Sequence, residues 1–307
     1  NIKSSFKVIR LCLIVLKLFK IFKKYPNTLT HFFLPQAYIV GMIAAMTARS
    51  KCKLIMSRRS LNLYQKNFPL SKTIEKFLHK KVDKILVNSK AVKNQLINKE
   101  NVSKNKIKII YNGVDARYRK RDNRRYGKSS IIMIANLIPY KNHRMVLYAL
   151  NIIKEKLPKD WFIYFIGRDD GIRKDLVSLA EKLEIRKNTL FIHTEDIHSI
   201  LPDMSMVILC SEEESFPNAI LEYFSHKVPV ISSDVGGCKE IVKNKKNGIL
   251  LKENSDLELS KAILYLYKNK KIGKKFGTEG FKIIKKKFTL NKMINEHERE
   301  YLEQVNP

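Results

Sequence analysis

The sequence predicts an α/β protein of two domains, each with a parallel sheet covered by helices. The 307 residues exceed one minimal domain and suit two domains of roughly 120 to 170 residues. Short runs rich in β-branched residues alternate with helical patterns of roughly 10 to 15 residues, which is typical of βαβ units. The alternation breaks once, in a polar and strongly basic stretch at 111–130, which predicts a linker between the domains.

The first half begins with a helix expected over 6–24, and a turn and short strand follow at 25–34. Helices and strands then alternate. The helices are expected at 37–50, 70–82 and 90–100, and the strands at 52–57, 84–89 and 107–115.

The second half repeats this pattern. Strands are expected at 130–137, 161–167, 189–194, 205–211 and 228–234. Helices are expected at 142–157, 172–185, 196–204 and 258–269, around Glu222, and over the last thirty residues. The pattern predicts two Rossmann-like domains facing a crevice, with ligand outside the carboxyl ends of the strands. The expected bounds are 1–125 for the first domain with its linker, 126–285 for the second, and 286–307 for a helix packing back toward the first.

The chain is strongly basic, with 60 Lys and Arg against 29 Asp and Glu and a net charge of +31. This favours anionic partners such as nucleic acid, phosphorylated substrates or a membrane surface. Lys, Asn and Ile are frequent throughout, so the charge alone does not choose among them. Four cysteines without metal-ligand spacing indicate free thiols in a reducing compartment.

The expected location is cytoplasmic, because the sequence has neither a signal-peptide pattern nor the ~18 to 20 apolar residues of a membrane span. A peripheral association with the inner face of the cell membrane is a further expectation. The helix at 6–24 has two interpretations: a basic amphipathic helix on anionic lipid, or a domain helix packed on a sheet. Because the chain opens at Asn1 directly into this helix, we expect it to be a fragment.

Two glutamates in "EESFPNAILE" stand on either side of a proline. Proline is favoured at the first position of a helix and disrupts a helix interior. Pro217 therefore places Glu214 in the loop after a strand and Glu222 in the second turn of the following helix.

A helix N-terminus beyond a strand end suits a phosphate, and carboxylates nearby can accept hydrogen bonds from hydroxyl groups. A nucleotide-sugar offers sugar hydroxyls, a diphosphate and ribose hydroxyls in that order. Lys141, with Arg144 behind it, follows another strand of the same half and could meet the diphosphate charge. Alternatively, the glutamates merely complement the helix dipole.

Residues 211–250, "SEEESFPNAILEYFSHKVPVISSDVGGCKEIV" continuing to "NGIL", resemble the nucleotide-sugar-binding signature of GT-B glycosyltransferases of glycosyltransferase family 4. "LVNSKAV", "IIYNGVD" and "IANLIPYKN" resemble further segments of that family in the expected order. The resemblance covers essentially the whole chain. It implies the GT-B fold and transfer of a sugar from a nucleotide-sugar donor to an acceptor.

By resemblance, the catalytic residues are Glu214, which faces the transferred sugar, and Lys141, which neutralises the departing diphosphate. Glu222 would hold the ribose. The resemblance places the remaining donor contacts at the backbone of Ser215, Phe216 and Asn218, and the nucleobase near Thr194 to Ile197.

The chain departs from the family pattern at three places. Asn136 stands where many members have an arginine, so leaving-group stabilisation would depend more on Lys141 or Arg144. Arg58 and Arg59 stand near where many members have a histidine, and are either acceptor-side residues or a solvent-exposed pair. The first strand and glycine-rich loop of the family are lacking.

We therefore expect a glycosyltransferase that retains anomeric configuration and needs neither metal nor cofactor, since D-x-D is missing. Its acceptor would be a sugar or a lipid-linked sugar in surface polysaccharide or glycolipid assembly. A nucleic-acid-binding protein, or a GT-B epimerase or phosphorylase, remains the alternative. We expect structural or exposed roles for His193, His198 and His226, and helix capping for the aspartates after Arg168.

Overall fold

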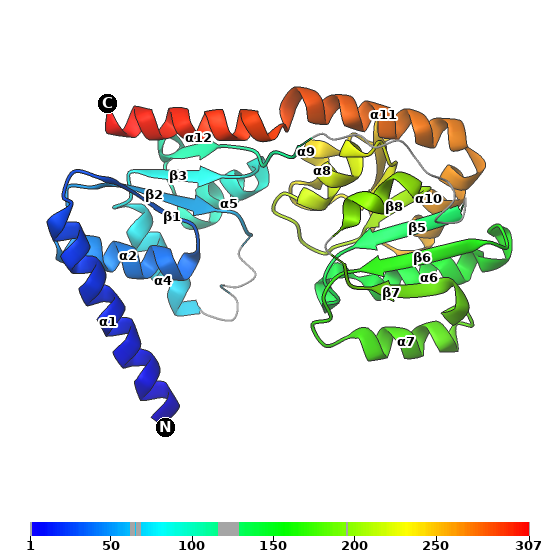
Figure 1. Ribbon diagram of the computed structural model, residues 1–307, viewed down its shortest axis with the longest axis horizontal. Coiled ribbons are helices and arrows are strands. Elements are labelled where there is room, and N and C mark those ends of the chain that lie inside the picture. The colour runs from blue at the N-terminus through cyan, green and yellow to red at the C-terminus, as the bar shows by residue number, and fades with distance from the viewer. Residues whose placement is uncertain (1, 62–64, 66–68, 116–128, 195, 307) are drawn as a thin grey trace. The chain divides into compact units, whose positions relative to one another are not determined.

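The computed structural model describes residues 2–61, 65, 69–115, 129–194 and 196–306 (Figure 1). The chain forms two compact units. Unit 1 comprises Asn1–Tyr111 and Met293–Pro307, and unit 2 comprises Asn112–Lys292. Most of the stretch predicted as a linker, 116–128, lies outside the described residues. Each unit is a parallel sheet with helices, which confirms the predicted α/β class.

The described residues of unit 1 form a sheet of four parallel strands in the order β1-β2-β3-β4. The strands are β1 (Leu29–Phe32), β2 (Lys53–Arg58), β3 (Lys84–Val87) and β4 (Ile107–Ile109). The helices are α1 (Ile2–Lys24), α2 (Pro35–Thr47), α4 (Pro69–His79), α5 (Lys90–Glu100) and α12 (Leu290–Val305).

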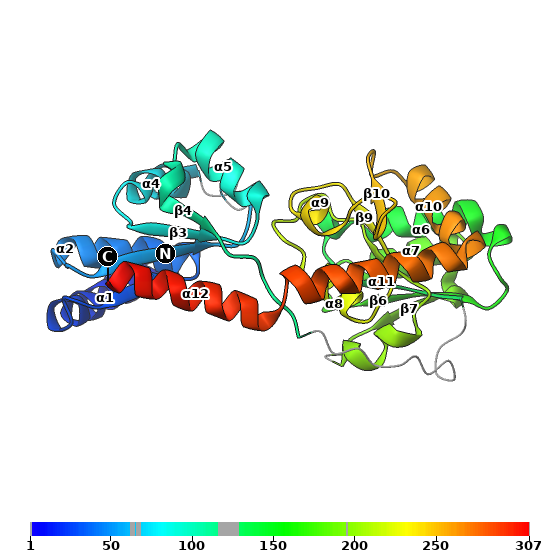
Figure 2. The same cartoon turned by 90° about the horizontal axis from the view of Figure 1, so that it is seen from above.

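The alternation of side chains along these strands builds a core on both faces of the sheet. Phe32, Met56 and Val87 pack into the larger cluster with residues of α2, α4 and α5. Ile55 and Leu86 point to the opposite face, where Met293 and Tyr301 of α12 pack on them. The last helix of the chain thus belongs structurally to unit 1 (Figure 2).

The helix predicted at 6–24 is present as α1, and one face of it packs on the core. Val15, Leu18, Phe19 and Phe22 recur at the i, i+3, i+4, i+7 spacing of a helix and contact the larger cluster. The interpretation of a packed domain helix holds for this face. Other positions of α1 remain exposed and apolar, with Ile9, Leu11, Leu13, Ile14, Leu16 and Ile21 all more than 40% exposed.

In unit 2, the part of the chain that the structure describes forms a sheet of six parallel strands in the order β10-β9-β8-β5-β6-β7. They are β5 (Ser129–Ile134), β6 (Trp161–Ile166), β7 (Thr189–Ile192), β8 (Met206–Leu209), β9 (Val230–Ser233) and β10 (Gly248–Leu251). The helices are α6 (His143–Ile153), α7 (Arg173–Lys182), α8 (Asn218–Ser225), α9 (Cys238–Ile241), α10 (Asp256–Lys268) and α11 (Lys270–Lys287). Strand β10 and the single turn α9 were not predicted, and the helix expected at 196–204 is two short 3-10 turns, Ile197–Ser199 and Leu201–Asp203.

The strand order reverses between β5 and β8. From β5 the chain proceeds outward to β6 and β7, then returns to place β8 on the other side of β5. Connections after these two strands therefore diverge to opposite faces of the sheet. In open parallel sheets, this switch point at the carboxyl edge is where ligands bind.

Helix α11 holds α8 in place through glycines. A Cβ at Gly277 would lie 1.9 Å from the Lys227 carbonyl oxygen, and one at Gly280 would lie 2.2 Å from the Phe224 ring. Only glycine permits this close approach of α11 to α8 and to the turn that follows α8. Among the described helices, none combines the length and the apolar character that crossing a membrane requires.

Candidate active site

Lys141 and Glu214 meet at the switch point of unit 2. Lys141 lies in the connection after β5, and Glu214 lies in the connection after β8. The Lys141 Nζ donates to Glu214 Oε1 over 2.6 Å. Their side chains are 17% and 12% exposed, so the pair is shielded from bulk water yet still reachable by a ligand.

The backbone fixes the two loops that carry this pair. Glu212 N donates to the Tyr140 carbonyl over 2.9 Å, which ties one loop to the other. Gly237 N donates to the Glu214 carbonyl over 3.1 Å. A Cβ at Gly237 would lie only 2.2 Å from the Ser215 carbonyl oxygen, so the turn after β9 needs glycine here.

Ser211 is a site residue that the sequence interpretation missed. Its Oγ donates to Glu214 Oε1 over 2.7 Å, so the same carboxylate oxygen accepts from both Lys141 and Ser211. The signal was a hydroxyl residue closely following a buried strand, three positions before Glu214. Two donors to one oxygen leave Oε2 as the oxygen better placed to accept from a ligand.

Helix α8 begins at Asn218, with Pro217 as its N-cap, close to the predicted start near Pro217. Proline has no side-chain oxygen that could accept from the first N–H groups of the helix, so these groups suit an anion. The Asn218 Oδ1 accepts from Asn112 Nδ2 over 2.7 Å, which anchors the start of α8. Phe216 is buried and packs on Phe288, with 5.5 Å between ring centroids, so it would contribute backbone rather than side-chain contacts.

Glu222 lies in the second turn of α8, as predicted. Burial raises the pKa of its carboxyl group above the ordinary value. The next residue, Tyr223, accepts from Ile134 N through its hydroxyl over 3.0 Å and so fastens α8 to the end of β5. A partly desolvated carboxylate held this rigidly gains most from hydroxyl donors on a ligand.

A cavity of about 240 Å³ opens beside the carboxyl ends of β6 and β7. Phe191 and His193 line it, together with Arg173, whose guanidinium carbon lies 5.8 Å from the centre of the Phe191 ring. Gly167, at the end of β6, also lines it. Thr194 and Ile197, where the nucleobase was predicted, do not border this cavity, although Thr194 directly follows His193.

Comparison with known protein families identifies the family of this chain. The description "Glycosyl transferases group 1" matches residues 114–283, more than half of the chain, and "Glycosyltransferase Family 4" matches residues 4–118. The chain belongs to the group 1 glycosyltransferases. The predicted GT-B, family 4 resemblance is therefore confirmed.

Individual relatives agree. An uncharacterized glycosyltransferase of Methanocaldococcus jannaschii is 30% identical over 69% of this chain and 57% of its own length. The N-acetyl-alpha-D-glucosaminyl L-malate synthase of Bacillus anthracis is 28% identical over 69% of this chain and 58% of its own. The chain thus spans less than two thirds of the length of these relatives. The crystal structure of Anabaena HepE with UDP superposes with a TM-score of 0.83 at 20% identity, covering 94% of this chain and 81% of that one.

The other residues predicted from the sequence differ in their surroundings. Asn136 Oδ1 accepts from Arg168 N over 3.3 Å, and Arg144 is exposed on the first turn of α6. Asp169 accepts from the backbone N–H of Gly171 and of Arg173, which supports the predicted capping role. His198 and His226 contact each other, with 2.9 Å between Nδ1 and Nε2.

Arg58 and Arg59 of unit 1 differ sharply from each other. Arg58 is 1% exposed, so the interpretation of a solvent-exposed arginine pair is wrong for it. Its side chain alternates to the face of α4 and α5, where Nη1 lies 2.8 Å from Glu75 Oε2 and Nη2 lies 3.0 Å from Glu100 Oε1. Since the guanidinium is turned into the unit, a direct contact with acceptor is not supported. Arg59 is exposed and stays a candidate.

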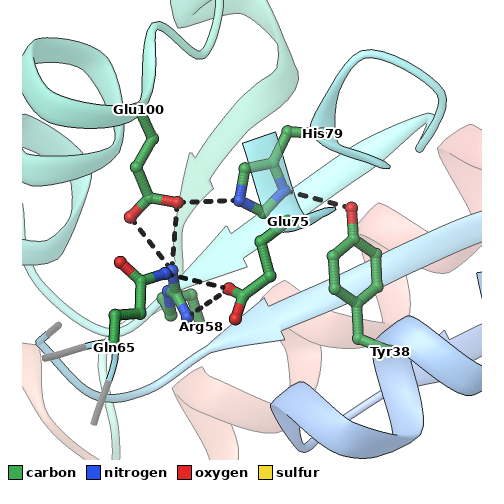
Figure 3. Close-up of polar contacts among 6 residues, drawn as sticks. All are labelled: Tyr38, Arg58, Gln65, Glu75, His79 and Glu100. Atoms are coloured by element: carbon green, nitrogen blue, oxygen red, sulfur yellow. Dashed lines mark hydrogen bonds and ion pairs between the residues drawn. The ribbon is translucent and has the colours of Figure 1, made fainter. Parts of the chain in front are cut away.

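A buried polar network surrounds Arg58 (Figure 3). His79 Nε2 lies 2.9 Å from Glu100 Oε2, and His79 Nδ1 lies 3.0 Å from the Tyr38 hydroxyl. Burial raises the pKa of Glu75, against the opposing charge of Arg58. Ligand atoms of Glu75, His79 and Glu100 lie within 4.8 Å of one another, as in a metal site. The guanidinium already neutralises these carboxylates, however, so an added cation would have to compete with it.

Proposed function

We propose that the chain is the catalytic part of a glycosyltransferase that moves a sugar from a nucleotide-sugar to an acceptor. The observation that carries this is the Lys141–Glu214 pair, 2.6 Å apart at the switch point and beside the N-terminus of α8. A cation, a helix N-terminus and two carboxylates match the alternating phosphate and hydroxyl groups of such a donor.

Each residue has a role in this proposal. The N–H groups at the start of α8 and the Lys141 ammonium bind the diphosphate, and Lys141 stabilises the charge that grows as the sugar departs. Glu214 accepts hydrogen bonds from the transferred sugar. Glu222, in the second turn of α8, accepts hydrogen bonds from the ribose.

The reaction breaks the bond between the anomeric carbon and the diphosphate oxygen, and forms one between that carbon and the acceptor hydroxyl oxygen. The acceptor proton passes to the departing diphosphate. Attack from the face that the diphosphate leaves gives retention of configuration, as the family resemblance implies. Lys141 and α8 supply the positive charge, so we propose that neither metal nor cofactor takes part.

The base of the donor is proposed to bind in the cavity beside β6 and β7, between Phe191 and the loop after Gly167. An aromatic face beside a guanidinium offers stacking to any base, so the cavity by itself does not fix which one. Uridine diphosphate sugars are the first to test, because HepE structures hold UDP and UDP-glucose.

The acceptor is proposed to be a sugar or a lipid-linked sugar, in surface polysaccharide or glycolipid assembly at the inner face of the cell membrane. The net charge of +31 supports an anionic surface as a partner. Arg59 of unit 1 is the candidate acceptor contact. Binding to liposomes that depends on anionic lipid would support this location, and equal binding without anionic lipid would contradict it.

A transfer or donor-hydrolysis assay tests the proposal. Wild type and Glu214→Ala are compared on the same nucleotide-sugar, with and without EDTA. We expect a large loss of turnover in the variant and no effect of EDTA. Unchanged turnover in Glu214→Ala would remove the role assigned to that carboxylate, and loss of activity with EDTA would contradict metal independence.

A further inference from the structure

An apolar groove lies between α2 and α4 of unit 1. It has a volume of about 340 Å³ and is lined by Ile43, Met46, Ile74, Phe77 and Leu78 with two threonines. Its lining residues all belong to α2 and α4, and none of them is among the candidate donor or acceptor residues. The groove is therefore separate from the sites described above.

The groove leaves large apolar side chains in water. Phe77 is 51% exposed, Ile43 is 41% exposed and Met46 is 39% exposed. Isolated exposed apolar residues are normal, but neighbours from two helices around one hollow indicate a binding surface. The floor is formed by Leu78, which is only 2% exposed. An occupant must accordingly be apolar and narrow enough to lie between two helices.

The same part of the chain is purely basic at its surface. Residues 1–74 contain 14 Lys and Arg and no Asp or Glu. The first carboxylate, Glu75, is 0% exposed and lies 2.8 Å from Arg58, so it does not reach the surface. No acidic group of this segment therefore offsets the positive charge around the groove.

Charge and apolar surface run side by side along α4. Thr73 and Phe77, four residues apart, line the groove. Lys72 and Lys76 of α4, with Lys80 directly after the end of the helix, follow the same i, i+4 spacing and form the adjacent stripe. Just beyond α2, Arg49 and Lys51 are also exposed. A hydrocarbon chain in the groove would thus have an anionic group within reach of several cations.

We propose that the α2–α4 groove binds a hydrocarbon chain of an anionic membrane lipid, and that the lysine stripe of α4 binds its phosphate. A nucleic acid would match the charge but not the apolar hollow, and an apolar helix would match the hollow but not the cations. The inference rests on the proposed membrane location, and it assigns the site where the membrane is held.

Tryptophan fluorescence gives a direct test. The single natural tryptophan, Trp161, is 4% exposed in the core of unit 2 and serves as an internal reference. Phe77→Trp adds a tryptophan at the groove, and Tyr148→Trp adds one at a 36% exposed position on α6 as the matched control. Vesicles of anionic phospholipid with brominated acyl chains should quench the tryptophan at position 77 and leave the one at 148 unchanged.

Two further variants test the contacts. Phe77→Asp should abolish vesicle co-sedimentation, and because Phe77 is half exposed the fold should survive. Lys72, Lys76 and Lys80 changed together to Gln should weaken binding about 100-fold, at roughly fivefold for each lysine. Donor hydrolysis is measured in parallel without vesicles and should be unchanged in all groove variants.

The outcomes separate the two proposals. Vesicle binding without quenching at position 77 would overturn the groove while leaving the membrane location intact. No binding to anionic vesicles would overturn both. If a second copy of the chain occupied the groove instead, the protein would form a dimer. Phe77→Asp would dissociate this dimer and vesicles would not affect it, and this result would also overturn the inference. If the wild-type protein hydrolyses no nucleotide-sugar donor, that result would instead contradict the proposed function.

Discussion

Two clusters of this chain both pair a basic side chain with glutamate, but they lie in different surroundings. In unit 2, Lys141 after β5 pairs with Glu214 from the loop after β8, and the side chains are 17% and 12% exposed. In unit 1, Arg58 at the end of β2 pairs with Glu75 and Glu100, and all three are at most 3% exposed. The first pair sits on loops that a ligand can reach, whereas the second is enclosed between helices and sheet.

The difference shows what marks a site. A buried ion pair costs desolvation and is destabilising to break, but it exchanges nothing with solvent. A partly exposed pair on loops at a switch point can exchange its partner for a charged ligand. A structural ion-pair cluster thus differs from a candidate active site in how deeply its charged groups are buried and in whether they can exchange partners with a ligand. The presence of charge does not distinguish the two.

Arg58→Met should have the largest effect on stability. It leaves Glu75 and Glu100 buried without their cation, which typically costs about 3 to 5 kcal/mol. Hydrogen exchange of β2 and β3 during denaturant titration measures this for unit 1 alone. Arg299→Met, which breaks an exposed pair with Glu303 within unit 1, is the matched control and should leave exchange unchanged. Equal effects of both changes would contradict the contrast drawn above.

Lys141→Ala should have the largest effect on catalysis. Loss of one preorganised charge at a departing group typically lowers kcat about 10²- to 10³-fold. Steady-state transfer measures it, with Lys154→Ala as the control, because Lys154 pairs on the surface with Glu184 at 3.3 Å. If both variants lose activity to the same extent, the catalytic role assigned to Lys141 is contradicted.

Glu222→Gln should weaken binding of the nucleotide-sugar donor and stabilise the protein in the absence of donor. Loss of charged acceptors for ribose hydroxyls should raise the donor KM about tenfold. Because burial raises the pKa of Glu222, this carboxyl group ionises at a lower pH in the unfolded chain than in the folded one. The free energy of unfolding therefore falls as pH rises above 4.5, the ordinary pKa of the group. Melting temperatures of variant and wild type should therefore separate at neutral pH and converge well below pH 4.5. A variant less stable at neutral pH would contradict this.

His31 should give the smallest effect, as a pH dependence in unit 1. It contacts Ser57 at 2.8 Å and Tyr301 of α12 at 2.7 Å. Burial, His297 and Arg59 lower the pKa of His31 to about 4. The unfolded chain therefore binds the extra proton first, and this contribution to stability is lost as pH falls from 6.5 toward 4. His31→Gln should flatten that part of the curve, and an unchanged slope would exclude His31 as its source.

The sequence predicted those features that depend on local pattern. Alternating β-branched and helical runs revealed the two α/β units, and Pro217 placed Glu214 in a loop and Glu222 in a helix. Lys141 and Glu214 were both predicted to bind the donor because each follows a strand of the same half, whereas their direct contact is seen only in the structure. These inferences need only neighbouring residues and the rule that carboxyl ends share an edge.

Other features depend on partners distant in the chain and were missed. Arg58 is buried because α4 and α5 supply Glu75 and Glu100 to it, 17 and 42 positions later, which no local pattern indicates. Strand β10 has four residues between polar turns, too few for a clear period. The role of Ser211 depends on where Glu214 folds back.

Calorimetric titration of nucleotide-sugars into wild type and Lys141→Ala tests the central claim most directly. The claim is that the Lys141–Glu214 pair marks a nucleotide-sugar site in unit 2. We predict saturable binding of at least one nucleotide-sugar to wild type and at least about tenfold weaker binding to the variant, since a charge-assisted contact is lost. Equal affinity in the two proteins, or no binding across a panel of nucleotide-sugars, would contradict it.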